Sequence, residues 1–309
     1  MIVTVTLNTA LDKTYTVENF VLDRVHRPTE TKATAGGKGI NVARVLKEFG
    51  RDVLATGFVG GCNGDKVIAG LDQEGINHDF VRIAGESRIC VAVVDLANGT
   101  QTEVNENGPE VQPEELRALK SKVESLMPSA EWLVLSGNAP PGAPADFYAE
   151  LIEIARRCDV RTALDASGLH LQEGVAAGPF IVKPNVAELS ALVGRELLTL
   201  EEMLEAARSL IHMGVNIVIV SMGRAGCVAT DGNRSWQAAP PEIPFVSAVG
   251  SGDALLAAVI DSLLSGSDVP EAVRHGVAAG AANAMTYGAG FCAKHSIMTL
   301  KDKVIVTEV

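Results

Sequence analysis

The chain has 309 residues, of which 47% are hydrophobic, 21% are charged and only 4% are aromatic, a balance typical of a soluble globular protein with an aliphatic core. The formal net charge is −12 and no run of Lys or Arg occurs, which argues against nucleic acid as a partner. Its five scattered cysteines form no C-x-x-C pair, and no stretch resembles a signal peptide or a membrane span, so we expect a cytoplasmic protein without a zinc site, disulfides or a membrane partner.

From the N-terminus onward, short β-branched runs alternate with amphipathic helical stretches. This alternation predicts an α/β fold with parallel strands joined by helical crossovers, and such sheets bind ligands at the carboxyl ends of their strands. We expect strands at 2–7, 53–59, 131–136, 160–165, 180–182 and 216–220, and helices near 38–49, 64–74, 113–126, 145–157 and 200–213.

Two segments break this alternation. Residues 13–35 are polar and poorly helical, and residues 88–105 have the pattern of a hairpin around Asn98-Gly99, a pair that favours the positive φ angles of a tight turn. We expect the two segments to pair as a small accessory β-layer, which serves as a mobile lid over the site or as a dimer contact. Because no linker or repeat interrupts the sequence, we interpret residues 1–309 as one domain with a lid.

The first chemical motif lies at a loop-to-helix junction, Gly36-Gly37-Lys38-Gly39-Ile40-Asn41. It is not a Walker A loop, because a glycine follows the lysine where Ser or Thr must hold magnesium. The glycines allow a ligand close to the backbone, and the carboxamide of Asn41 offers a donor and an acceptor to hydroxyl groups. A tight turn with a solvated lysine is the alternative.

The second motif comes after Pro240, Pro241 and Pro244, which exclude a regular helix there. Gly250-Ser251-Gly252-Asp253 then opens a helix that we expect to run to about residue 265, followed by another from about 270 to 287. Backbone N–H groups at a glycine-rich helix start suit the charge on a transferring phosphoryl group, and Asp253 is placed to accept a proton from a hydroxyl. An ordinary helix cap is the alternative.

Together, the two motifs resemble the signatures of the ribokinase-like PfkB carbohydrate kinases, an early Gly-Gly-Lys-Gly-x-Asn and a late Gly-Ala-Gly-Asp. Within that family the chain looks most similar to the phosphofructokinase and tagatose-6-phosphate kinase branch, on the residues Leu7-Asn8-x-Ala10-Leu11-Asp12, Thr56-Gly57-Phe58-Val59-Gly60-Gly61 and Thr102-Glu103-x-Asn105-Glu106-x-Gly108-Pro109. The resemblance covers essentially the whole chain. It implies a ribokinase-like three-layer α/β/α sandwich with a small β-sheet lid, and ATP and Mg²⁺ as cofactors.

The sequence departs from the family pattern at the late motif. Ser247-Ala248 stand where Asp-Thr is usual, and Ser251 replaces the usual alanine. The resemblance implies that the first change is tolerated in the phosphofructokinase-like branch. The second change adds a hydroxyl but leaves the backbone N–H groups of the anion hole, so we expect activity to be retained.

The resemblance also implies roles for individual residues. On the sugar side, Asp12 would accept a sugar hydroxyl, Gly37, Lys38 and Asn41 would line the sugar site, and Arg88 would grip the substrate phosphate, aided by Arg27 unless that arginine is only a solvated surface charge. The base would be Asp253, beside an anion hole made by Gly250, Ser251 and Gly252.

The nucleotide side is implied in the same way. Lys183 and Asn185 would bind nucleotide phosphates, and Glu188 of the same N-x-x-E motif would hold magnesium, partly through waters. Ser221, Gly223 and Gly226 match the nucleotide-binding turn. Asn283 would help to close the adenine pocket, unless it is a polar residue on a helix packing face.

The expected reaction is transfer of the ATP γ-phosphoryl group to a ketohexose monophosphate, with fructose 1-phosphate and its bisphosphate product favoured. Fructose 6-phosphate and tagatose 6-phosphate are the alternative substrates. Fructofuranose is nearly two-fold symmetric with a CH₂O arm on each side of the ring, so fructose 6-phosphate can present a phosphate and a free hydroxyl as fructose 1-phosphate does. Tagatose 6-phosphate differs from fructose 6-phosphate only in the configuration of one hydroxyl. Alternatives of other kinds are a ribose or nucleoside kinase and a non-catalytic sugar-phosphate sensor. An exposed lid edge favours a homodimer through the lid.

Overall fold

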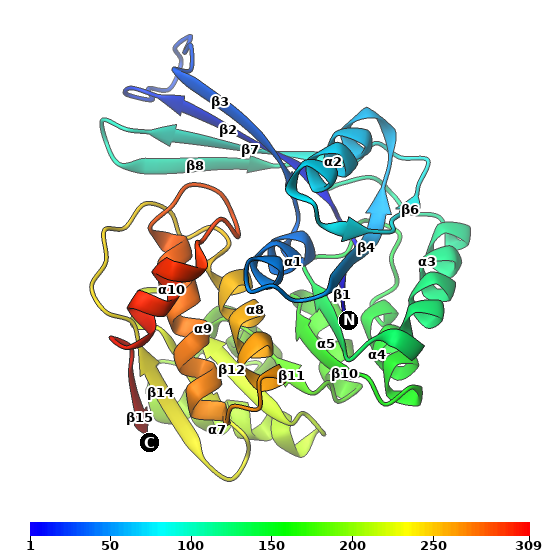
Figure 1. Cartoon of the computed structure of the whole chain (residues 1–309), viewed down its shortest axis with the longest axis vertical. Helices are drawn as coiled ribbons and strands as arrows, with labels where there is room; N and C mark the ends of the chain where they lie inside the picture. Colours follow the sequence, from blue (N-terminus) through cyan, green and yellow to red (C-terminus); the bar gives the residue numbers. More distant parts are fainter.

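A computed structural model describes residues 1–309 and contains two separate β-sheets (Figure 1). The large sheet has the strand order β15-β14-β13-β12-β11-β10-β9-β1-β4-β5, and β6 pairs with β4 beside it. Its strands are β1 (Ile2–Thr6), β4 (Val53–Val59), β5 (Asn77–His78), β6 (Val81–Arg82), β9 (Trp132–Ser136), β10 (Arg161–Asp165), β11 (Ile181–Val182), β12 (Ile217–Ser221), β13 (Cys227–Thr230), β14 (Ser235–Ala239) and β15 (Ile305–Glu308).

The pairing confirms the predicted parallel core and adds an antiparallel edge. All six predicted strands are present within one residue of their expected ends, and neighbours from β4 to β12 run parallel. Strands β13, β14 and β15 extend the sheet in antiparallel fashion and were not predicted. They are only four or five residues long, so their alternation is too short to stand out.

Helices cover both faces of the large sheet. They are α1 (Lys38–Glu48), α2 (Gly61–Glu74), α3 (Pro113–Leu126), α4 (Phe147–Arg157), α5 (Gly168–Ala176), α6 (Val186–Val193), α7 (Leu200–His212), α8 (Ser251–Leu264), α9 (Val269–Ala284) and α10 (Lys294–Lys301), with short 3₁₀ turns at Met127–Ser129 and Gly223–Ala225. The helices α5, α6 and α10 were missed because each has only eight or nine residues, about two turns of periodicity. None of the helices has the length and apolarity needed to cross a lipid bilayer.

Two hydrophobic clusters produce the three layers. One has 42 buried residues and joins one face of the sheet to α1, α2, α8, α9 and α10; the other has 35 and joins the opposite face to α3 to α7. Successive residues of a strand point to opposite faces, and accordingly Ile2 belongs to the first cluster and Val3 to the second. This is the α/β/α sandwich that the sequence predicted.

The small sheet, which we call the lid sheet, stands above α1 and the C-terminal helices in Figure 1. Its order is β3-β2-β7-β8, from β2 (Ala10–Val17), β3 (Glu30–Gly36), β7 (Arg88–Asp95) and β8 (Thr100–Asn105). The segments predicted at 13–35 and 88–105 therefore do pair with each other, through the parallel strands β2 and β7. The layer begins slightly earlier than predicted, at Ala10.

The turn of the 88–105 hairpin differs from the prediction. A tight Asn98-Gly99 turn needs positive φ at both residues, but only Gly99 has it, at 61°, and the connection spans residues 96–99. The buried carboxylate of Asp95 organises this longer loop: it accepts from the Ala97 N–H at 3.0 Å and from Asn98 Nδ2 at 2.7 Å. A side chain before the turn thus decided its length.

Candidate active site

Two adjacent cavities open at the carboxyl ends of the parallel strands. The first, which we call the lid cavity, has a volume of about 420 Å³ and lies between the small sheet and the ends of β10 to β12. The second, the turn cavity, has a volume of about 640 Å³ and lies against the turn after β12 and the start of α8. Ser221 and Gly252 line both, so the two cavities meet at the first turn of α8.

Asp253 lies at this meeting point, in the first turn of α8. The helix is entered through Gly250, whose φ of 81° favours glycine and whose added Cβ would stand 2.6 Å from the Ala289 backbone. The Asp253 side chain is buried, and its Oδ2 accepts a hydrogen bond from Asn41 Nδ2 at 2.8 Å. Burial and the neighbouring Asp165 raise the pKa of Asp253 to about 6, against the opposing charge of Lys38.

A buried carboxylate that sequence reasoning missed organises the centre of the lid cavity. Asp165 ends β10, and its two oxygens hold Lys38 Nζ and Lys183 Nζ, each at 2.9 Å. Burial alone would raise the pKa of Asp165, but the two ammonium groups outweigh it and lower that pKa. Both lysines are thereby fixed beside Asp253. The available signal was its place at the carboxyl end of a correctly predicted strand.

We expect Asp165→Asn to destabilise the fold, because it leaves the buried ammonium group of Lys183 without a counter-charge. Removing one partner of a buried ion pair costs about 3 kcal/mol. Urea unfolding followed by circular dichroism would measure the loss. The control is Glu131→Gln, which breaks an exposed ion pair at the N-terminus and should change the unfolding free energy by less than about 1 kcal/mol. An equal loss in both variants would contradict the clamp.

The lid sheet contributes a carboxylate and a guanidinium on the neighbouring strands β2 and β7, from Asp12 and Arg88. Asp12 lines the lid cavity. Its carboxylate packs closely against Gly36, where an added Cβ would stand 2.2 Å from it. Burial raises the pKa of Asp12 to about 6, although Arg88 and Arg44 oppose the shift. Arg88 opens β7 and donates from Nε to the Asn8 carbonyl and from Nη1 to the Glu106 carbonyl, which leaves Nη2 without a protein partner.

The N-x-x-E motif folds as a reciprocal helix cap. The Glu188 N–H donates to Asn185 Oδ1 at 2.9 Å, and the Asn185 N–H donates to Glu188 Oε2 at 2.8 Å, at the start of α6. Both residues, like Lys183, line the lid cavity. Glu188 Oε1 has no protein partner, so this carboxylate oxygen is free to bind a ligand while Oε2 serves the helix cap.

The carboxylates of the site could hold magnesium only with the help of waters and substrate phosphates. No group of three or more His, Cys, Asp or Glu side chains is arranged to hold a metal ion. Magnesium commonly keeps several waters and is held by one or two carboxylates together with substrate phosphates, which the free oxygen of Glu188 fits.

The predicted nucleotide turn lines the turn cavity. Ser221 ends β12, and Gly223 and Gly226 follow it with φ angles of 58° and 87°. At Gly226 a Cβ would stand 2.0 Å from the Ala238 carbonyl oxygen, so the close approach of β14 requires glycine. Ser251 and Gly252 close the cavity from α8.

Three site residues inferred from the sequence have different surroundings from those expected. Arg27 is exposed in the loop between β2 and β3 and lines neither cavity, so it does not assist Arg88 within one chain. Asn283 is fully buried outside the turn cavity: its Nδ2 donates to the Val249 carbonyl at 2.7 Å and its Oδ1 accepts from the Gly290 N–H at 2.8 Å. The Asn283 side chain therefore points toward the loops that contain Val249 and Gly290, while Ala281 and Ala284 of the same helix line the turn cavity.

Asn41 is the third. It lines the lid cavity, but its carboxamide is already engaged, with Nδ2 on Asp253 and Oδ1 accepting from Arg44 Nη1 at 3.0 Å. It therefore holds the carboxylate in place more than it offers a donor and an acceptor to sugar hydroxyls.

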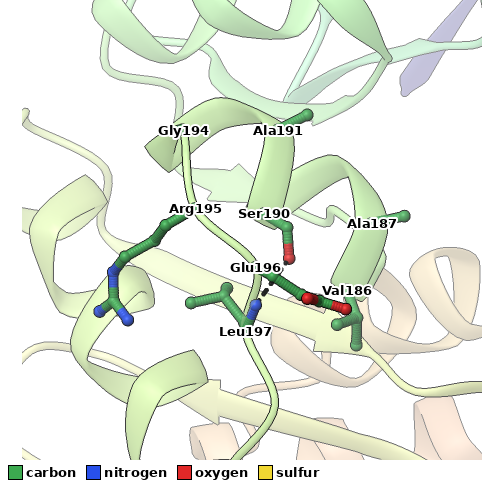
Figure 2. A pocket seen from close by; sticks show the side chains of 8 residues that line it. All are labelled: Val186, Ala187, Ser190, Ala191, Gly194, Arg195, Glu196 and Leu197. Atoms are coloured by element: carbon green, nitrogen blue, oxygen red, sulfur yellow. Dashed lines mark hydrogen bonds between the residues drawn. The ribbon is translucent and has the colours of Figure 1, made fainter.

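A further cavity of about 640 Å³ lies along α6 and the loop after it (Figure 2). It contains none of the predicted site residues, and its visible polar contact is the Leu197 N–H donating to Ser190 Oγ at 3.2 Å. Arg195 is paired with Glu205 at 2.9 Å. We assign no chemistry to it.

The model of the pfkB family of carbohydrate kinases matches residues 5–296. The chain belongs to the pfkB family. Its membership confirms the resemblance inferred from the two glycine-rich motifs, and this pfkB kinase is an ATP-dependent sugar kinase.

Solved structures agree over almost the whole chain. Phosphofructokinase-2 from Escherichia coli, in complex with potassium, is 31% identical, with 98% of each chain covered and a TM-score of 0.92. A structure from Thermotoga maritima described as a possible 1-phosphofructokinase is 27% identical, covers 100% of this chain and 99% of its own, and has a TM-score of 0.92. Arabidopsis thaliana ribokinase with ribose and ATP, 21% identical over 97% and 98% with a TM-score of 0.77, shares the fold.

Proposed function

We propose that this pfkB kinase phosphorylates a ketohexose monophosphate, with fructose 1-phosphate as the preferred substrate and fructose 1,6-bisphosphate as the product. The observation that carries the proposal is the pairing, in one cavity, of a buried carboxylate at a helix start with an arginine that keeps a free donor, Asp253 and Arg88. A sugar that already carries a phosphate gives that arginine its partner. Similarity to two phosphofructokinase structures supports the same substrate class.

In the proposed mechanism, Asp12 accepts a hydrogen bond from a sugar hydroxyl, and Arg88 binds the substrate phosphate. Asp253 takes the proton of the attacking hydroxyl, and the N–H groups at residues 250–252 stabilise charge on the transferring group. ATP would lie in the turn cavity with its phosphates toward the shared Gly252, near Lys183. Glu188 would hold magnesium together with waters, and the ion would neutralise phosphate charge when bound. Most of the rate enhancement would come from positioning and electrostatics.

Fructose 6-phosphate and tagatose 6-phosphate are the competing substrates. Each presents one phosphate and one free primary hydroxyl at similar separations, so discrimination depends on a few hydrogen bonds worth ~1–3 kcal/mol each when left unpaired. A coupled ADP-release assay across these two sugars, fructose 1-phosphate, ribose and adenosine tests the proposal. The highest kcat/KM on fructose 1-phosphate is expected; preference for ribose or adenosine, or no turnover on any of them, would overturn it.

We expect the rate to depend on pH through Asp253. Its pKa is raised to about 6, and a base must be deprotonated to act, so kcat should be nearly constant above pH 7 and fall below pH 6. Each further pH unit should lower kcat about tenfold. The pKa of Asp12 is also raised to about 6, so the acid limb becomes steeper if both carboxylates must be ionised. A kcat that stays flat down to pH 5 would contradict this.

We also propose that the lid sheet forms a homodimer contact. Its loop between β2 and β3 carries Leu22 and Val25 with 82% and 88% of their surface exposed, and the sheet has two open edges, β3 and β8. Light scattering after gel filtration should give twice the chain mass for the native protein and the chain mass for Leu22→Asp/Val25→Asp. A monomeric native protein would contradict the contact.

A further inference from the structure

Arg44 is a buried arginine of α1 whose guanidinium reaches the candidate base through one intervening side chain. Its Nη1 donates to Asn41 Oδ1 at 3.0 Å, and Asn41 Nδ2 donates to Asp253 Oδ2 at 2.8 Å. We propose that Arg44 is a positioning residue that locks the carboxamide of Asn41 in the one orientation that presents its N–H to Asp253. The inference deepens the proposed function, because it rests on Asp253 acting as the base.

The two contacts select a single orientation of the carboxamide. Asn41 and Arg44 are three residues apart on α1 and therefore share one face of the helix. Rotating the carboxamide by a half turn would place its oxygen against the Asp253 carboxylate and its N–H groups against the Arg44 guanidinium. Both contacts would then be repulsive, so the arginine and the carboxylate act together on the amide between them.

Arg44 is itself held without freedom to turn away. Nε and Nη2 form a bidentate pair with Glu74 Oε2 and Oε1, at 2.5 and 3.1 Å. Nη1 also donates to the Ala289 carbonyl at 2.8 Å, and Nη2 to the Ala35 carbonyl at 2.7 Å. All five N–H groups of the guanidinium thus have acceptors, and the Phe291 ring stacks on the group at 4.4 Å. A lysine has no planar fork and cannot reproduce this set.

The sign of the effect follows from the charges around each group. Asp165, Lys38 and Lys183 surround Asp253, whereas Arg44 faces Glu74 and acts on Asp12. The hydrogen bond from Asn41 stabilises the ionised form of Asp253 and so lowers its pKa. Losing the correct carboxamide orientation removes that bond and raises the pKa of Asp253, which moves the acid limb of the rate profile to higher pH.

The test is Arg44→Lys, which keeps the positive charge next to Asp12 and Glu74 but removes the fork. We expect the acid limb of kcat to rise by about one pH unit, so that kcat at pH 5.5 falls about tenfold while kcat at pH 8.5 changes little. The control is Arg51→Met, which removes an arginine that contacts α8 through Asp261 and lines neither cavity. It should leave the pH profile unchanged.

A double-variant cycle separates positioning from a general structural effect. In an Asn41→Ala background, Arg44→Lys should produce no further shift, because the amide through which it acts is absent. An equal shift in that background, no shift in Arg44→Lys alone, or the same loss at every pH would overturn the inference. If Arg44→Lys does not fold, Glu74→Gln, which loosens the same guanidinium, should give a smaller shift in the same direction.

A second readout keeps the inference distinct from the proposed function. The carboxyl ¹³C resonance of Asp253, assigned by its loss in Asp253→Asn, reports the titration of this group without any substrate. Absence of turnover in the native enzyme would refute the proposed function alone. An unshifted Asp253 titration in Arg44→Lys would refute the positioning role alone.

Discussion

Asp253→Asn is expected to lower kcat by about a hundredfold or more while binding of ATP and sugar phosphate changes little. Asparagine has the same shape and can still accept the hydrogen bond that Asn41 donates, so the first turn of α8 should remain in place. What it lacks is the ability to take up the proton of the attacking hydroxyl at neutral pH. The loss should therefore appear in kcat, with KM nearly unchanged.

Stopped-flow or coupled kinetics would measure the fall in kcat, and calorimetry would measure the binding of ATP and sugar phosphate. A matched control is Asp261→Asn, since Asp261 is another carboxylate of α8 with an arginine partner, near the opposite end of the helix. That variant should retain most of its kcat. Near-normal turnover in Asp253→Asn would remove Asp253 from the role of base.

The second large effect is expected for Arg88→Gln. Hydrogen bonds to a charged group contribute about 1.5–3 kcal/mol each, and a guanidinium binds a phosphate through two of them. Their loss should lower kcat/KM for the phosphorylated sugar by at least about a hundredfold, mainly through KM. Glutamine keeps one donor for the Glu106 carbonyl, so the start of β7 should not be disrupted.

The specificity of that loss distinguishes phosphate binding from a structural effect. Activity on unphosphorylated fructose, which offers Arg88 no anion, should fall far less than activity on the sugar phosphate. Arg82→Gln is the control, because Arg82 is an exposed arginine of β6 that is paired with Asp65 and lines neither cavity. Equal losses on both sugars would indicate that Arg88 does not bind the substrate phosphate.

The hairpin at residues 88–105 shows how far local pattern reaches. Alternation and the Asn98-Gly99 pair were enough to predict two strands and a turn between them. They did not predict the length of the turn, because Asp95, a residue before it, is buried and collects the loop N–H groups. Burial of Asp95 depends on the β2–β7 pairing, in which Val17 and Asp95 are partners although 78 residues separate them, and this pairing leaves no local signal.

Local periodicity and short motifs were sufficient to predict the strands of the parallel core, the two strands of the 88–105 hairpin and the two glycine-rich helix starts, the second of which carries Asp253. Only the tertiary structure showed that Asp165 binds both lysines, that Arg27 and Asn283 lie outside the cavities, and that Asn41 contacts Asp253 and Arg44. Asn41 and Asp253 are separated by 212 residues, and the bond between them exists because α1 and α8 pack on the same face of the sheet. Such contacts arise from the packing of remote elements, which no local pattern encodes.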